Sequence, residues 1–299
     1  MAKFIKNKFS IYRFLLFIGC VIMSFVNSEL LKSAIYGLAI GDALGVPYEF
    51  KERGSFTCKD MVGHGTHNQV AGTWSDDTSM ILATCSSLKA NDGKINLEDM
   101  SDRFKDWVFN GEYTPFGKVF DVGGTTIRAL KKGRGENDIY SNGNGSLMRI
   151  LPLAFTDANF DDIDNVSSIT HAHTISKEGC RIYVTIARKL LEKQDLKSIL
   201  ENLTVSDDYK RIKNLDKIEE DRIHSSGYVV HTLEASLWCL LNTDSYRDAV
   251  IKAVNLGDDT DTTGAVTGGL AGIIYGFDAI PKEWIDILQN KELIDSCIF

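Results

Sequence analysis

Two short stretches place carboxylates and hydroxyl groups directly before apolar runs. One reads GTWSDDTSMILATCSSL (72–88) and contains Asp76 and Asp77; the other reads NLGDDTDTTGAVTGGLAGIIYG (255–276). A single Asp is enough to cap a helix and complement its dipole. Asp258, Asp259 and Asp261 exceed that need, and their repulsion in a partly dry setting is costly without a cation. The pattern therefore predicts a cation site.

The expected cation is a hard divalent ion, because such ions prefer the oxygen ligands that both stretches offer. An EF-hand is excluded: if Asp259 is its first position, Leu270 falls at the twelfth, where Glu is required. The interpretation that remains is a site assembled from distant segments, which fits a pair of metal ions.

The elements that must position these residues are helices, because apolar residues from Glu29 onward recur at three- and four-residue spacing. Residues 50–72 and 110–121 are expected to be loops, and the charged stretch 204–226 a solvated connection. No shift in composition marks a second domain, so residues 29–299 are predicted to form one all-α domain. The expected helices are 30–44, 77–90, 98–109, 122–132, 145–155, 177–193, 228–242, 246–254, 260–276 and 281–289.

Two of these helices carry glycines at four-residue spacing, which forms one bare ridge along a helix. Glycine inside a helix costs up to about 1 kcal/mol relative to alanine, so the pattern needs a reason. Close approach of a second backbone supplies one, and we expect the two helices to be central and tightly packed. The ridges comprise Gly37, Gly41 and Gly45, and Gly264, Gly268, Gly272 and Gly276.

Composition limits the classes of partner and the compartment. The net charge is −8, so no basic excess is available for a nucleic-acid backbone. The six cysteines form no CxxC pair, which favours reduced, buried thiols in a cytosol-like compartment. Residues 1–28 favour a different location, because basic residues precede an apolar run from Phe14 to Val26, the layout of a signal or anchor segment. Alternatively, the native start is Met23.

Six motifs occur in a recognisable order: GLAIGDALGVPYEF, GTWSDDTSM, DVGGTT, NGNGSLMR, THAHTIS and VNLGDDTDTTGAVTGGLAGIIYG. Together, from Leu30 to Trp284, they resemble the ADP-ribosylglycohydrolase family, of the type that includes the dinitrogenase-reductase-activating glycohydrolases. The resemblance implies a compact, orthogonal helical bundle that holds two Mg²⁺ or Mn²⁺ ions. It also implies metal-dependent hydrolysis of the N-glycosidic bond between ADP-ribose and a protein side chain, arginine being favoured.

The resemblance also assigns roles to individual residues. Glu49, Asp76 and Asp77 are the candidate catalytic acids and bases, which the sequence does not rank. The candidate metal ligands are Ser75, Asp76, Asp77, Asp259, Asp261 and Thr262, with Ser75 standing where many relatives carry Thr. The candidate substrate-binding residues are Asp121, Gly143, Asn144, Gly145, Ser146 and His171. His64 and His67 are not expected to bind metal.

Two other functions share these features. A metal-dependent nucleotide phosphohydrolase would use the same ion site but release phosphate or AMP. A non-catalytic ADP-ribose binder or crystallin-like structural protein would keep the fold without the reaction. The expected partner is an ADP-ribosylated protein or a small ADP-ribosyl compound, with no nucleic acid and no stable protein partner.

Overall fold

The computed structural model describes residues 28–299, in which secondary structure consists of helices and isolated β-bridges. This confirms the predicted all-α class. The expected signal or anchor segment lies outside the described residues, apart from Ser28. No helix among residues 28–299 combines the length and apolar character needed to cross a bilayer.

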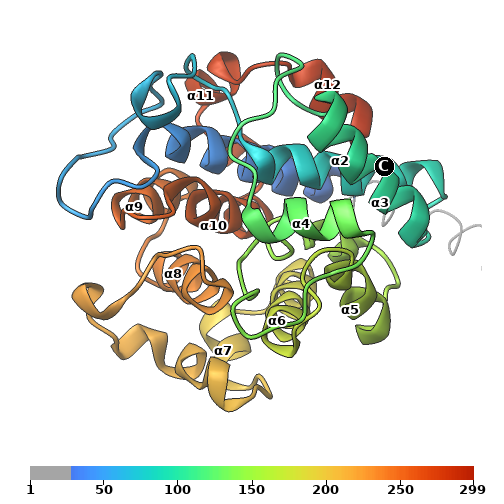
Figure 1. The fold of residues 1–299 in the computed structure, drawn as a ribbon. Helices are drawn as coiled ribbons and strands as arrows, with labels where there is room; N and C mark the ends of the chain where they lie inside the picture. The colour runs from blue at the N-terminus through green and yellow to red at the C-terminus, as the bar shows by residue number, and fades with distance from the viewer. Residues whose placement is uncertain (1–27) are drawn as a thin grey trace, which may run out of the picture.

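The helices enclose one core, and the long connections between them include residues 49–75, interrupted only by η2, and 111–123 (Figure 1). After a first helix at 28–45 come α2 (Asp76–Ala90), α3 (Leu97–Asn110), α4 (Gly124–Lys132), α5 (Phe160–Ser168), α6 (Thr174–Leu191), α7 (Leu196–Glu201), α8 (Val229–Leu241), α9 (Tyr246–Asn255), α10 (Thr260–Tyr275), α11 (Lys282–Ile287) and α12 (Lys291–Cys297). The 3-10 helices are η1 (Val46–Tyr48), η2 (Gly65–His67), η3 (Leu151–Phe155), η4 (Asp207–Lys217), η5 (Glu220–Arg222) and η6 (Phe277–Ala279).

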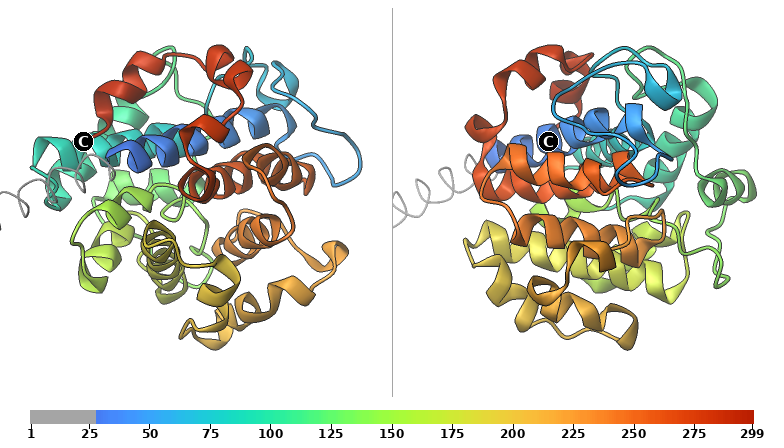
Figure 2. Two further views of the ribbon diagram at one scale, coloured as in Figure 1. Left: turned by 180° about the vertical axis from the view of Figure 1, so that it is seen from behind. Right: turned by 90° about the vertical axis from the view of Figure 1, so that its left-hand side faces the viewer.

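The two glycine ridges lie against each other at the centre of the molecule, where the helix at 28–45 runs beside α10 (Figures 1 and 2). A Cβ atom added at Gly37 would collide with the carbonyl oxygen of Gly268, and one added at Gly268 would collide with that of Gly37. Gly41 and Gly264 oppose each other in the same way. The expectation that both helices are central and tightly packed is confirmed. Because Gly45 then abuts the backbone of Asp261, this packing brings the first helix to the acidic loop.

Two predicted elements differ in the structure. Residues 145–155 form turns and the short helix η3, because Pro152 lacks the N–H that an α-helix requires at that point. The stretch 204–226 is not simply a solvated connection. It forms η4 and η5, and η4 buries Tyr209, Ile212 and Leu215. These apolar residues recur every three positions, which is the period of a 3-10 helix. The many charged residues around them make this period hard to recognise in the sequence.

Candidate active site

Asp42 holds the acidic start of α2 in place through hydrogen bonds. This residue lies in the helix at 28–45 and is fully buried. Its carboxylate accepts hydrogen bonds from the N–H groups of Ser75 at 2.9 Å and Thr78 at 3.0 Å, and from the Thr78 hydroxyl at 2.6 Å. Asp42 therefore caps α2 from another segment. Ser75 and Asp77 are left free of the capping role, and their side chains bond to each other at 3.1 Å between Ser75 Oγ and Asp77 Oδ2.

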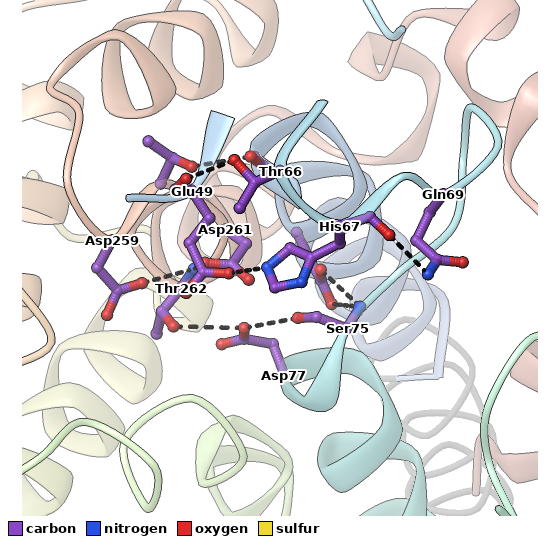
Figure 3. Close-up of polar contacts among 12 residues, drawn as sticks. Glu49, Thr66, His67, Gln69, Ser75, Asp77, Asp259, Asp261 and Thr262 are labelled. Atoms are coloured by element: carbon purple, nitrogen blue, oxygen red, sulfur yellow. Dashed lines mark hydrogen bonds and ion pairs between the residues drawn. The ribbon is translucent and has the colours of Figure 1, made fainter. Parts of the chain in front are cut away.

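The two acidic stretches, at the starts of α2 and α10, contact each other directly. The Thr262 hydroxyl donates to Asp77 Oδ2 at 3.3 Å, although the two residues are 185 positions apart (Figure 3). Asp259 caps α10 by accepting from the Thr262 N–H at 3.3 Å. The start of α10 thus faces the start of α2, with carboxylates from both helices between them.

Several of these carboxylates lack the partners that buried charges normally have. Asp77 Oδ1 and Asp261 Oδ2 are buried, and no hydrogen-bond partner for either lies among the described residues. Burial, together with neighbouring carboxylates, raises the pKa of Asp77 and Asp261 well above the usual range. Burial likewise raises the pKa of Asp42 to about 6. A cation between these groups would satisfy both orphaned oxygens and favour the ionised forms.

Ligand atoms close enough to share a cation occur in two overlapping sets. Asp42, Asp77 and Asp261 offer oxygens within 4.8 Å of one another, as do Glu49, Asp259 and Asp261. The donors are carboxylate oxygens, which suit Mg²⁺ and Mn²⁺ better than zinc or copper. The residues present therefore fit a divalent metal ion.

Glu49 and His67 form a third group beside these carboxylates. Glu49 follows η1, is 5% exposed, and its Oε2 pairs with Nε2 of His67 on η2 (Figure 3). With Asp121 they offer ligand atoms within 4.8 Å of one another. Burial raises the pKa of Glu49 to about 7, the His67 hydrogen bond opposes the rise, and the Asp121 and Asp259 charges add to it.

The carboxylates open into a cleft of about 300 Å³. One wall is the first turn of α4, Gly124–Thr126, whose N–H groups have no side-chain cap. Such a helix start favours an anion. The cleft is lined by Glu49, Phe50, Asp76, Asp121, Gly123, Gly124, Thr125, Thr126, Gly143, Asn144, Gly145, Met148, His171, Gly227, Asp259 and Thr262. It therefore joins a carboxylate end to an anion-binding end.

The NGNG loop and His171 also line the cleft. The Asn144 amide donates to Asp259 Oδ2 at 2.7 Å, which ties this loop to the acidic start of α10. The Asn144 N–H donates to the Gly227 carbonyl at 3.0 Å and is not free for a ligand. His171 is 2% exposed, and burial lowers its pKa to about 3, so its imidazole is neutral.

Ser146 is the predicted substrate-binding residue that the structure places away from the cleft. Its side chain is fully buried behind the NGNG loop, where the hydroxyl accepts from Ser167 at 2.9 Å and contacts the Cys180 thiol. Two residues after Asn144 the chain has turned into the core, so the side chain packs between α5 and α6. Every other predicted catalytic and substrate residue lines the cleft except Asp77, which is fully buried.

Sequence reasoning missed two residues of this site, Asp42 and His67. Asp42 belongs to the quoted motif GLAIGDALG, and its signal was a lone carboxylate in an otherwise apolar, glycine-ridged helix. His67 lay in a glycine-rich loop with no cysteine nearby, and only the packing of η2 on η1 brings it to Glu49. Conversely, Asp258 of the acidic run turns outward and is exposed.

A helical bundle with carboxylates and an uncapped helix start in one cleft suits a hydrolase that acts on charged sugar derivatives. The chain belongs to the ADP-ribosylglycohydrolase family, whose model matches residues 28–298. This confirms the resemblance stated from the motifs.

Similar proteins cover most of the chain. The ADP-ribosylarginine hydrolase Tri1 of Serratia proteamaculans (strain 568) is 34% identical, covering 93% of this chain and 80% of that protein. The ADP-ribosyl-[dinitrogen reductase] glycohydrolase of Rhodospirillum rubrum is 31% identical, covering 86% and 90%. A solved structure described as an ADP-ribosylglycohydrolase-related protein complex aligns with a TM-score of 0.77 and 29% identity, over 91% of this chain and 96% of that one.

Proposed function

We propose that the protein hydrolyses the N-glycosidic bond between ADP-ribose and arginine side chains. The observation that carries the proposal is the cleft that brings together the carboxylates of Asp76 on α2 and Asp259 at the start of α10 with the uncapped start of α4. A sugar bearing a diphosphate needs both features side by side. The names of the relatives from Serratia and Rhodospirillum support the same reaction class, and the Serratia name specifies arginine.

The cleft orients the substrate by charge. The diphosphate belongs at the first turn of α4, where the N–H groups of Gly124–Thr126 favour negative charge. The ribose attached to arginine then lies at the carboxylate end, near Asp76 and Asp259. His171 is neutral and lines the same wall, so it accepts or donates one hydrogen bond without repelling a cation or an anion.

The ribose end would hold two Mg²⁺ or Mn²⁺ ions through Ser75, Asp76, Asp77, Asp259, Asp261 and Thr262, with Asp42 as an added candidate ligand. When bound, such ions supply Lewis-acid polarisation and fix the orientation of sugar hydroxyl groups. The carboxylates themselves stabilise the positive charge that develops on the sugar ring as the bond to arginine breaks.

Glu49 is the favoured group for proton transfer. Its pKa of about 7 means that both protonation states are populated near neutral pH, as a general acid or base requires. It lines the cleft close to Asp121, so it can take a proton from the attacking water or give one to the departing guanidine. Asp76 lines the same end and is the second candidate.

The test is hydrolysis of ADP-ribosyl-arginine by purified protein with Mg²⁺ or Mn²⁺, followed by chromatographic identification of the product. Free ADP-ribose is expected, and Asp261→Asn should abolish its release. The matched control is Asp258→Asn, which changes an exposed carboxylate three residues away and should retain activity. Release of AMP or phosphate would favour the phosphohydrolase, and no product with wild-type protein would contradict the proposal.

A further inference from the structure

The loop from His64 to Gln69 makes two polar contacts with Glu49. The Thr66 hydroxyl donates to the Glu49 carbonyl at 2.7 Å, and His67 Nε2 pairs with the Glu49 carboxylate. Both contacts come from η2, which packs on η1 directly before Glu49. The backbone and the side chain of Glu49 are therefore held by the same short segment.

This loop is itself rigidly placed. Gly65 has a positive φ of 64° and lies so close to the Pro47 carbonyl that a Cβ atom could not fit. The His64 backbone N–H donates to the Gln69 carbonyl, and the Gln69 amide donates to the His67 carbonyl at 3.1 Å. The backbone of the segment that carries His67 is consequently fixed by contacts within the loop and with Pro47.

The Glu49 carboxylate would otherwise face groups that repel it. Asp121, Asp259 and Asp261 each have an oxygen within 4.8 Å of a Glu49 oxygen. Among residues 28–299, His67 is the only side chain that hydrogen-bonds this carboxylate. The His67 ring is confined between Phe50 and Phe120, with centroid distances of 6.0 and 5.2 Å.

We propose that His67 is a positioning residue for the reaction, which holds the Glu49 carboxylate in the orientation needed for proton transfer. This inference rests on the proposed hydrolysis, and it assigns a role to a histidine outside the proposed set of metal ligands. His67 acts through Glu49, so its loss should change the rate of the chemical step more than the binding of substrate.

The experiment compares His67→Ala and His67→Gln with wild-type protein on ADP-ribosyl-arginine in saturating Mg²⁺. His67→Ala is expected to lower kcat about 10- to 100-fold, with KM changed by less than about twofold, because a misplaced catalytic group slows chemistry. His67→Gln should recover most of the rate, since its amide nitrogen can donate from nearly the same place. His64→Ala, in the same loop but exposed and bonded only to Asn68, should keep the wild-type rate.

A double-mutant cycle separates positioning from structural damage. In a Glu49→Gln background, His67→Ala should cause little further loss, because the group it positions is already disabled. Additive losses, a wild-type rate in His67→Ala, or no recovery in His67→Gln would each overturn the inference. So would a lower stoichiometry of Mg²⁺ binding to His67→Ala by calorimetry, which would make His67 a metal ligand. Inactive wild-type protein would instead contradict the proposed hydrolysis itself.

Discussion

Replacing Asp261 by Asn should stabilise the metal-free protein while removing its response to metal. Asp261 Oδ1 accepts from the Thr262 N–H at 2.9 Å, a bond that Asn keeps, and Oδ2 has no partner among the described residues. The change therefore removes a charge without removing a hydrogen bond. Such behaviour is expected of a carboxylate retained for binding rather than for folding.

The magnitude follows from the spacing of the carboxylates. Asp261 has oxygens within 4.8 Å of Asp42 and Asp77. At that separation each pair of charges repels by about 3.5 kcal/mol at an effective dielectric constant of about 20. Because the raised pKa values mean that protons already relieve part of this repulsion, we expect a net gain of about 1–3 kcal/mol. For a domain of this size that corresponds to an increase in Tm of about 2–6 °C.

The assay is thermal unfolding at pH 7.5, in EDTA and in excess Mg²⁺. Wild-type protein should gain about 2.7 kcal/mol when Mg²⁺ is 100-fold above its Kd, whereas Asp261→Asn should gain little. In EDTA the Tm of the variant should exceed that of wild type. In Mg²⁺ the two Tm values should become equal, or their order should reverse. A variant that melts below wild type in EDTA, or that responds equally to Mg²⁺, would refute the reasoning.

Three further predictions concern the parts that support the site. Gly268→Ala places a Cβ atom against the Gly37 carbonyl and should destabilise the fold by about 1–3 kcal/mol in urea unfolding; an unchanged midpoint would mean that the ridges do not touch. The pKa of His171 is lowered from 6.5 to about 3, so the unfolded chain binds its proton first, and the contribution of His171 to stability falls as pH drops below 6.5, by about 2 kcal/mol at pH 5. His171→Asn should remove that loss in denaturant titrations at pH 7.5 and 5, and an identical pH dependence would exclude it. Asp42→Asn sets an amide donor against the Thr78 N–H, which should cost about 1–3 kcal/mol and weaken Mg²⁺ binding in calorimetry; unaltered binding would show that Asp42 serves the fold alone.

The sequence was sufficient to predict features that follow from the residue types and their spacing within one segment. The glycine ridges at Gly41 and Gly264 indicated close helix packing because only a neighbouring backbone explains glycine at that spacing. Asp77 and Asp261 were identified because their number exceeds what helix capping needs. Both inferences rest on residue counts within one segment: more glycines than a helix favours, and more carboxylates than a helix start needs.

Features that depend on contacts between segments could not be predicted in this way. The sequence does not show that Asp42 caps α2 from another helix, nor that His67 reaches Glu49, because both contacts are set by how helices and loops pack. Ser146 shares its motif with Asn144, yet a turn of two residues moves it from the cleft into the core. Such changes of direction are decided by tertiary packing and not by residue type.

The central claim is that the acidic starts of α2 and α10 together hold divalent cations. Anomalous diffraction from crystals soaked in Mn²⁺ tests it most directly, because it locates the ions without reference to activity. We predict two peaks within coordination distance of the carboxylates of Asp77, Asp259 and Asp261. Manganese bound elsewhere, or no peak between Asp77 and Asp261 at saturating concentration, would contradict the account.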